Sequence, residues 1–182
     1  MEKNYNVVIS EEQLQQRVES LAKEISNDYK GKEPIIICML KGAVYFFADL
    51  CKKITTPIMI DFARLSSYRN GTTSGEMELV ADITTEIKGR DVILVEDIVD
   101  SGKTLSYFIN LLQKKEPASI QICSLLDKKE RREVEIAVKY VGFADLQCGF
   151  VIGYGLDYAE KFRELPFIAE VIDPSKPIVI EY

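Results

Sequence analysis

The sequence predicts an α/β domain with a mainly parallel sheet, because short apolar runs alternate with amphipathic segments along the chain. The chain has 182 residues, of which 47% are hydrophobic and 29% are charged, a composition typical of a globular domain with a substantial core. No repeat, low-complexity stretch or linker interrupts the pattern. We therefore expect one domain over residues 1–182.

The first expected elements are a helix, a strand and a second helix. Residues 10–13 form a capping-box pattern, and apolar residues then recur at helical spacing over residues 14–25. Residues 34–40 are apolar throughout, which is typical of a strand covered on both faces. Residues 43–53 return to helical composition, so this part is predicted to be a strand-turn-helix unit.

The later elements continue the alternation. In sheets of this kind ligands bind beyond the carboxyl ends of the strands, so we expect a site where the loops after the central strands meet. These loops contain residues 40–43, 96–104 and 127–128. In chain order the elements are strands over 57–65, 76–80 and 91–96, a helix over 101–115, and apolar runs over 118–126, 138–143 and 149–152.

Charge and residue usage restrict the possible functions. The chain has 23 Lys and Arg against 29 Asp and Glu, a net charge of −6, which argues against nucleic acid as a partner. No basic stretch leads into an apolar one near the N-terminus and no apolar run reaches spanning length, so we expect a cytoplasmic protein without membrane contact. Histidine is absent, so a general acid or base must be a carboxylate, Lys, Tyr or Cys.

The four cysteines are predicted to be buried free thiols rather than disulfides or zinc ligands. They lie far apart in mostly apolar contexts and form no C-x-x-C pair. They are Cys38, Cys51, Cys123 and Cys148.

The stretch VILVEDIVDSGKTL, residues 92–105, carries the clearest chemistry. A nucleotide-binding P-loop would need glycine where Asp97 stands, so that interpretation fails. A plain alternative is a helix start in which Asp100 or Ser101 is the cap and Lys103 is solvated. The neighbouring carboxylate of Glu96 adds a third like charge, which is costly unless the site binds sugar hydroxyls or Mg²⁺.

The second half of this stretch suits a phosphate group. The amides of residues 101–104, two hydroxyl groups and the positive end of the predicted helix form a site for one phosphate monoester. A ribose 5-phosphate satisfies both the acidic and the phosphate-binding half.

This stretch closely resembles the phosphoribosyl pyrophosphate (PRPP) signature of the type I phosphoribosyltransferase family. Three other stretches resemble its 6-oxopurine branch, the hypoxanthine-guanine phosphoribosyltransferases. They are LKGA at 40–43, RLSSY at 64–68, and GFVIGYGLDY at 149–158 continuing to FRELP at 162–166. The resemblance implies the type I fold, in which a small hood formed by the N- and C-terminal segments accompanies the central sheet.

The resemblance also implies a reaction and partners. PRPP and hypoxanthine or guanine would give IMP or GMP and pyrophosphate, with Mg²⁺ as the cofactor, in a purine salvage enzyme. Family members are usually homodimers or homotetramers. Preference among hypoxanthine, guanine and xanthine does not follow from the sequence.

Residue roles follow from the matched motifs. For PRPP, the resemblance implies that Glu96 and Asp97 hold the ribose hydroxyls directly or through metal, and that Asp100 takes or shares the proton on N7 of the purine. The 5-phosphate would be bound by Asp100, Ser101, Gly102, Lys103 and Thr104. Pyrophosphate would be bound by Lys41, Gly42 and Arg163, the first two in a loop with a cis peptide bond that does not involve proline.

The purine and lid residues come from the remaining motifs. Lys128 matches a donor to O6 of the purine, Phe150 a stacking ring and Val151 a backbone contact. Asp157, which we also expect at the purine site, matches a carboxylate that reaches a second Mg²⁺ near the pyrophosphate. The metal ligands would therefore be Glu96, Asp97 and Asp157. Ser67 and Tyr68 match a lid over the site.

Alternative interpretations stay open at several of these positions. Without the resemblance, Phe150 would be a core residue, residues 40–42 an ordinary turn and Arg163 a solvated helix residue. Lys129 competes with Lys128 for the contact to O6, within a charged KKERRE run that is otherwise typical of solvated surface.

Two other functions are compatible with the PRPP motif. One is a regulatory protein that senses PRPP, and the other is a phosphoribosyltransferase for a different base. Asp100, the Lys41-Gly42 pair and Arg163 argue for an enzyme, because their implied roles lie in the chemistry rather than in holding PRPP. The 150–157 stretch argues for a 6-oxopurine.

Overall fold

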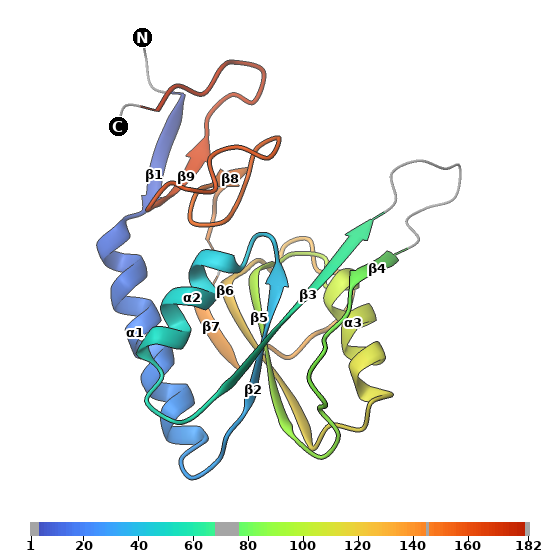
Figure 1. Ribbon diagram of the computed structural model, residues 1–182. Coiled ribbons are helices and arrows are strands. Elements are labelled where there is room, and N and C mark those ends of the chain that lie inside the picture. Colours follow the sequence, from blue (N-terminus) through green and yellow to red (C-terminus); the bar gives the residue numbers. More distant parts are fainter. Residues whose placement is uncertain (1–3, 68–76, 145, 181–182) are drawn as a thin grey trace.

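The structure is a computed structural model that describes residues 4–67, 77–144 and 146–180. Its elements form two separate sheets with helices beside the larger one (Figure 1). In chain order they are β1 (Tyr5–Ile9), α1 (Glu11–Asp28), β2 (Ile35–Leu40), α2 (Val44–Lys53), β3 (Met59–Ser67), β4 (Met77–Ala81), β5 (Asp91–Val99), α3 (Lys103–Gln113), β6 (Ser119–Asp127), β7 (Tyr140–Ala144), β8 (Val151–Ile152) and β9 (Ile168–Val171).

The larger sheet has six strands in the order β4-β3-β2-β5-β6-β7. Every neighbouring pair is parallel except β3 and β4, so the predicted parallel sheet is confirmed. The strand predicted over 76–80 is its antiparallel edge strand, β4.

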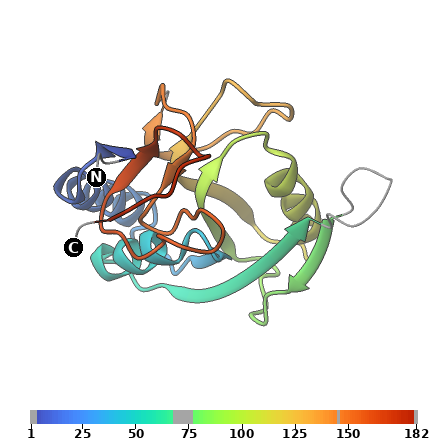
Figure 2. The ribbon, with the colours of Figure 1, turned by 90° about the horizontal axis from the view of Figure 1, so that it is seen from above.

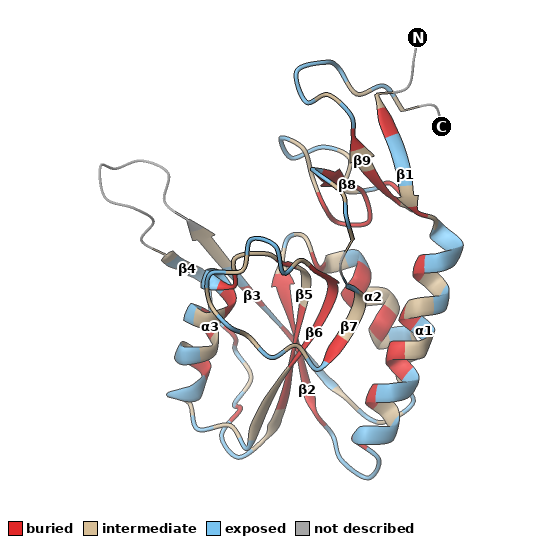
Figure 3. Cartoon of the chain, turned by 180° about the vertical axis from the view of Figure 1, so that it is seen from behind, coloured by how far each residue is buried: buried red, intermediate tan, exposed pale blue. Residues whose placement is uncertain are grey.

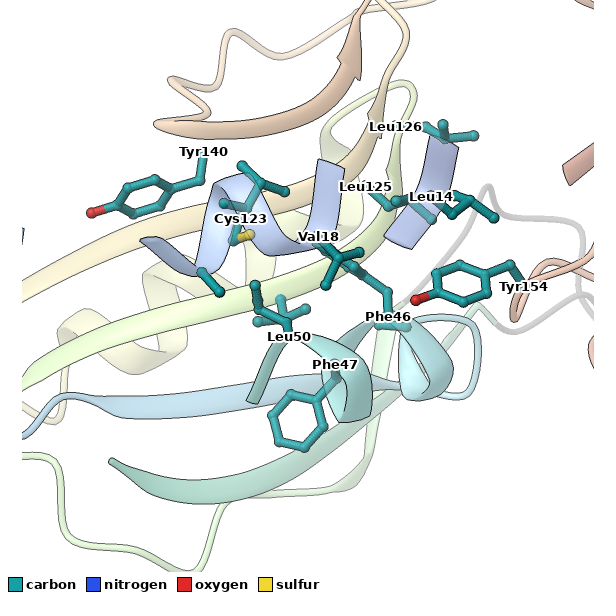
Figure 4. Packing of buried hydrophobic residues seen from close by; sticks show 14 of the residues in the cluster. Leu14, Val18, Phe46, Phe47, Leu50, Cys123, Leu125, Leu126, Tyr140 and Tyr154 are labelled. Atoms are coloured by element: carbon teal, nitrogen blue, oxygen red, sulfur yellow. The ribbon is translucent and has the colours of Figure 1, made fainter. Parts of the chain in front are cut away.

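Helices cover both faces of this sheet (Figure 2). On one face α1 and α2 enclose a cluster with alternate residues of the central strands, among them Ile36 and Cys38 of β2 (Figure 4). On the other face α3 packs on Ile35 and Ile37 of the same strand. The residues of β2 up to Met39 are at most 5% exposed, as predicted for a strand covered on both faces (Figure 3).

The smaller sheet joins the two ends of the chain. Its order is β1-β9-β8, and β1 pairs with β9 antiparallel, with Tyr5 opposite Val171. We call this sheet and the segment 153–167 the hood. It lies at the end of the large sheet toward which the parallel strands point (Figure 1). The sequence analysis missed β1 and β9 as strands.

A buried tyrosine attaches the hood to the helical layer. Tyr154 is 5% exposed and reaches into the cluster under α1 and α2 (Figure 4). Its hydroxyl donates to Asp49 Oδ2 of α2 over 2.8 Å, and Gln15 of α1 donates to the same oxygen over 2.9 Å. Burial and this carboxylate raise the pKa of Tyr154, so the phenol remains a donor. The hood is therefore fixed to both helices.

Two boundaries differ from the prediction around the PRPP-like stretch. The strand β5 continues to Val99 rather than ending at Glu96, so Asp97 also lies within the strand. The helix α3 begins at Lys103 after Gly102, which has a left-handed conformation with φ +82°. The N-cap residue is Gly102 rather than Asp100 or Ser101, although Ser101 Oγ accepts from the amide of Lys103 over 3.4 Å.

The cysteines are free, as predicted, but only two of them are fully buried. Cys38 and Cys123 are buried, whereas Cys51 and Cys148 are half-buried. Burial raises the pKa of the Cys38 and Cys51 thiols to about 12. These thiols are therefore packing groups rather than nucleophiles. Within the described ranges, no helix has both the length and the apolar content to span a membrane.

Candidate active site

A cavity of about 600 Å³ lies between the carboxyl ends of β5 and β6 and the hood. Asp97, Asp100 and Lys128 line it from the large sheet and the loops that follow. The hood contributes Val151 and Asp157, and Phe150 lines the cavity directly before β8. Residues expected at the ribose, purine and metal sites are thus brought together from opposite sides of one hollow.

A smaller hollow continues from this cavity at Asp100. Glu96 and the loop of residues 100–104 line it, with Leu105 of α3 behind the loop. Because neighbouring residues of a strand point to opposite faces, Glu96 lines this hollow and Asp97 lines the larger cavity. Asp100 borders both.

The two acidic residues of β5 are held in an environment that disfavours their charge. Burial, together with the neighbouring charge of Asp97, raises the pKa of Glu96 well above its ordinary range. Burial raises the pKa of Asp97 to about 6, although the amide of Ile98 donates to its Oδ1 over 2.8 Å. Glu96 Oε2 is buried and has no hydrogen-bond partner in the described part of the chain. The hydrogen bond from Ile98 and the charge of Arg163 offset the burial of Asp97 only in part, so a cation or a further donor would stabilise the pair.

The acidic pair fits a cation that takes most of its ligands from water and from a bound phosphate group rather than from the protein. Among the described residues no group of three or more His, Cys, Asp or Glu could hold a metal ion. Both oxygens of Asp157 already have partners, since Oδ1 lies 2.8 Å from Arg163 Nη2 and Oδ2 accepts from the amide of Glu160 over 2.8 Å. Mg²⁺ commonly binds one or two carboxylates and completes its shell with water and phosphate oxygens.

The loop between β5 and α3 is held from the side by the segment 128–134. The carbonyl oxygen of Ser101 accepts from the amides of Glu133 and Val134 over 2.9 and 3.0 Å. A Cβ atom added at Gly102 would lie 2.6 Å from the carbonyl oxygen of Val134, so glycine is required there by both space and φ. Lys103 is not simply solvated, because its Nζ lies 2.5 Å from Glu133 Oε2.

Two glycines let three segments stack beside the acidic pair. The peptide bond between Leu40 and Lys41 is cis, as the resemblance implied. A Cβ atom added at Gly42 would overlap the Asp97 carboxylate, and one added at Gly155 would overlap the carbonyl oxygen of Gly42. The loop after β2 therefore lies between β5 and the hood, closer to each than any side chain would permit.

The two cations expected at the pyrophosphate site converge on one carboxylate. Glu160 Oε2 lies 2.6 Å from Lys41 Nζ, and its Oε1 lies 3.2 Å from Arg163 Nη2. Arg163 Nη1 also donates to the carbonyl oxygen of Gly155 over 2.7 Å, while its buried Nε has no partner in the described ranges. Arg163 is 20% exposed and lies in a turn of the hood, so the interpretation as a solvated helix residue is wrong.

The expected purine residues lie at the entrance of the cavity. Phe150 is 46% exposed, so the core interpretation is wrong, and the edge of its ring meets Tyr158 at a centroid distance of 5.6 Å. Lys128 Nζ donates to the carbonyl oxygens of Cys148 and Gly149 over 2.8 and 2.9 Å. Lys129 lines a different hollow.

Sequence reasoning missed several residues of the site. Arg131 Nη1 lies 3.4 Å from Asp100 Oδ2, the Arg132 side chain is 10% exposed and lies behind the loop between β5 and α3, and Glu160 and Tyr158 contact expected site residues. The KKERRE run is therefore more than solvated surface. Of the expected lid, Ser67 ends β3, whereas Tyr68 lies outside the described residues.

Comparisons with known proteins place this geometry in a family. Residues 9–159 match the family model described as the phosphoribosyl transferase domain. The hypoxanthine-guanine phosphoribosyltransferase of Bacillus subtilis is 45% identical over 176 residues, which cover 96% of this chain and 95% of that protein. A crystal structure of a hypoxanthine-guanine phosphoribosyltransferase from Bacillus anthracis is similar at a TM-score of 0.86, with 47% identity, and the match covers 91% of this chain and 98% of that one.

A longer relative contains a similar chain as one part. The bifunctional protein TilS/HprT of Listeria monocytogenes is 45% identical over 163 residues, 89% of this chain. This chain spans only about a quarter of that protein, since the match covers 25% of its length.

The stacked loops give a prediction for Gly155→Ala. The added methyl group would overlap the carbonyl oxygen of Gly42, and φ of +106° adds backbone strain, so we expect a large loss of stability measured by urea unfolding. Gly31→Ala is the control, because φ is +76° there but no atom of the described residues lies within 4 Å of the new Cβ. Equal losses in the two variants would show that the close approach has no cost.

The buried acidic pair predicts an unusual pH dependence of stability. A carboxyl group with a raised pKa in the folded state destabilises the fold as pH rises from about 4, the ordinary value, to about 6, the value for Asp97. Asp97→Asn should remove this loss and make the ligand-free protein more stable by about 1–3 kcal/mol at pH 7.

Asp61→Asn is the control, and we expect it to lower the stability at pH 7, whereas Asp97→Asn should raise it. Although burial alone would raise the pKa of Asp61, the amides of Thr85, Phe62 and Thr84 lower it, so the ionised form is stabilising at pH 7. Urea unfolding between pH 4.5 and 8 without metal measures both variants. If Asp97→Asn is the less stable protein at pH 7, the acidic pair does not destabilise the fold.

Proposed function

Because this chain belongs to the phosphoribosyltransferase family, we propose that it transfers the 5-phosphoribosyl group of PRPP to N9 of hypoxanthine or guanine. The products are IMP or GMP and pyrophosphate, as in purine salvage. The observation that carries the proposal is the single cavity in which Asp97, Asp100 and Lys128 face Phe150, Val151 and Asp157. Relatives named hypoxanthine-guanine phosphoribosyltransferase match nearly the whole chain, which supports the same activity.

The ribose 5-phosphate is proposed to bind along the end of β5 and the start of α3. The amides of residues 101–104 at the N-terminal end of α3 receive the phosphate, and Gly102 lets the chain turn tightly enough to present them. Glu96 and Asp97 accept from the ribose hydroxyl groups directly or through a metal ion. Their negative charge also stabilises the positive charge that develops on the ribose as pyrophosphate leaves.

Pyrophosphate is proposed to bind between Lys41, Gly42 and Arg163. The unpartnered Nε of Arg163 supports this, because a phosphate oxygen would satisfy a buried donor. Mg²⁺, when bound, would neutralise part of the charge on the pyrophosphate leaving group. Glu96 and Asp97 fit that ion, and Asp157 would contribute through a further shared ion or by orienting Arg163.

The purine is proposed to stack on Phe150 with its O6 toward Lys128. An ammonium group has three donors, and two of those on Lys128 are used by the carbonyl oxygens of Cys148 and Gly149, which leaves one for the purine. Asp100 then faces N7, and its buried Oδ1 has no partner in the described part of the chain. Val151 contributes a backbone contact to the edge of the base.

In the proposed reaction, N9 of the purine attacks C1 of the ribose while the bond to pyrophosphate breaks. Asp100 takes or shares the proton at N7, a contribution worth roughly 10²–10⁴ in rate. Closure of the site keeps water from the reactive sugar, and Ser67 and Tyr68 keep their proposed role as a lid.

A PRPP-sensing regulator and an enzyme for another base are the competing functions. Asp100 lines the cavity together with Asp157, which pairs with Arg163, and Arg163 shares Glu160 with Lys41. This supports catalysis, since a sensor needs no general base beside the sugar. We further propose a cytoplasmic homodimer or homotetramer. Ile60, Phe62 and Val80 on the neighbouring strands β3 and β4 are between 40% and 51% exposed, which supports assembly through that face.

A direct assay tests the proposed function. The purified chain, Mg²⁺ and PRPP are offered each purine and pyrimidine base in turn, and nucleotide formation and pyrophosphate release are measured. We expect turnover with hypoxanthine or guanine. Turnover only with another base would support a phosphoribosyltransferase for that base. PRPP binding without turnover on any base would support the PRPP-sensing regulator.

Asp100→Asn should lower kcat by about two orders of magnitude or more, since the amide has the same shape but cannot accept the N7 proton. Steady-state kinetics and urea unfolding are measured together, and stability should stay close to that of the parent. A kcat within a fewfold of the parent would remove Asp100 from the general-base role.

Lys128→Ala should raise KM for the purine more than KM for PRPP, because the lost donor faces the base. Lys129→Ala is the matched control, since Lys129 lies outside the cavity. A larger increase in KM for the purine in Lys129→Ala would make Lys129, not Lys128, the donor to O6.

Glu160→Gln should strengthen product inhibition by pyrophosphate by about two- to tenfold, because it frees Lys41 and Arg163 from an internal carboxylate. The control is Glu19→Gln, which removes the partner of Lys23 in an exposed ion pair of the same 2.6 Å length outside the cavity. An unchanged or weaker inhibition would mean that Glu160 does not compete with pyrophosphate.

A further inference from the structure

Arg132 occupies a largely buried position behind the loop of residues 100–102 between β5 and α3, which we call the phosphate-binding loop. Its side chain is 10% exposed, and it forms an ion pair with Asp127, which is 6% exposed, at the end of β6. A buried charge is costly without partners, so the remaining donors of the guanidinium group indicate what the residue is for.

Those donors hold the backbone at the end of β5. Arg132 Nε donates to the carbonyl oxygen of Asp100 over 2.9 Å, and Nη2 donates to that of Val99 over 3.2 Å. The carbonyl oxygen of Val99 also accepts from the amide of Lys128 over 3.0 Å. One side chain thus ties the backbone of Asp100 to the segment that carries Lys128.

The geometry points to Arg132 as a positioning residue for the proposed transfer, an inference that rests on the proposed function. The proposed general base and the proposed O6 donor lie on different strands, and each must meet its own atom of one purine ring. Arg132 fixes the backbone of both, so that Asp100 and Lys128 keep a constant separation when the substrates bind.

An arginine suits this task better than a lysine. The planar guanidinium group has five donors in a fixed arrangement, so it binds the Asp127 carboxylate and two carbonyl oxygens together. A lysine retains the ion pair but presents its donors from one point. The aliphatic stem of Arg132 also packs at Gly102, since a Cβ atom added there would lie 3.3 Å from Arg132 Cδ.

The role of Arg132 differs from that of its neighbours. Ser101, inside the phosphate-binding loop, is held by the amides of Glu133 and Val134 instead. Loss of the Arg132 side chain should therefore disturb Asp100 more than the amides that receive the 5-phosphate. The expected signature is a fall in kcat with a smaller change in KM for PRPP.

The experiment uses the full chain with Mg²⁺, PRPP and the best base from the assay above. In Arg132→Gln we expect kcat to fall about 100-fold, the scale of a misplaced catalytic group, while KM for PRPP changes less than fivefold. Arg132→Lys should recover part of this loss. Hydrogen exchange at the amide of Lys128 should accelerate in Arg132→Gln, because its acceptor, the Val99 carbonyl, is no longer fixed.

Two further variants separate positioning from folding. Asp127→Leu with Arg132→Met removes the buried ion pair as a unit, which should restore stability toward that of the parent without restoring kcat. Arg17→Gln is the matched control, since Arg17 donates to the carbonyl oxygens of Val141 and Gly142 over 2.5 and 2.9 Å, away from the site. We expect that control to lose stability and keep kcat.

The outcomes are distinct. A kcat of Arg132→Gln within threefold of the parent, or full recovery of kcat in the double variant, would overturn the positioning role and leave the proposed function intact. An inactive parent with every base would overturn the proposed function and this role with it.

Discussion

The buried acidic pair of β5 is the constraint on which the rest of the site depends. Glu96 and Asp97 belong to β5, directly after its four buried apolar residues, and both are half-buried, so their carboxylates are partly shielded from water. Burial raises the pKa of both, and Glu96 Oε2 has no hydrogen-bond partner in the described part of the chain. The positive charge of Arg163 offsets only part of this electrostatic cost at Asp97. A ligand that brings hydroxyl donors or a metal ion removes this cost. The electrostatic free energy that is unfavourable in the ligand-free protein therefore adds to the affinity for that ligand.

The surrounding segments keep the pair accessible and place other groups around it. Gly42 and Gly155 let the loop after β2 and the hood approach Asp97 more closely than side chains would permit. Tyr154 fixes the hood to α2, and Lys128, after β6, donates to the carbonyl oxygens of Cys148 and Gly149, just before β8. The arrangement is rigid where the sugar is proposed to bind. It is held by exposed ion pairs where pyrophosphate is proposed to bind, and such pairs are readily exchanged for a ligand.

Local sequence patterns predicted most of the fold, and they drew attention to the end of β5, where the acidic residues and the proposed phosphate-binding residues lie. The apolar run of β2 and the helical spacing of apolar residues in α1 located these two elements, because each pattern lies within one short segment of the sequence. It missed β1 and β9, whose pairing joins Tyr5 to Val171 across almost the whole chain. The same limit applies to Arg132 and Glu160. Arg132 lies in a charged run typical of solvated surface, and nothing in that run shows its contacts with the carbonyl oxygens of Val99 and Asp100. Glu160 likewise gains its partner Lys41 from a distant loop.

Proton release on ligand binding tests the central role of the acidic pair most directly. Calorimetric titration with PRPP in saturating Mg²⁺ at pH 6, repeated in buffers of different ionisation enthalpy, gives the number of protons exchanged. The raised pKa of Asp97, about 6, means that a large fraction of this carboxyl group is protonated before binding, and a bound cation favours its ionised form. The account predicts net proton release by the parent and less release by the variant Asp97→Asn. Equal release by the two proteins, or net proton uptake by the parent, would contradict it.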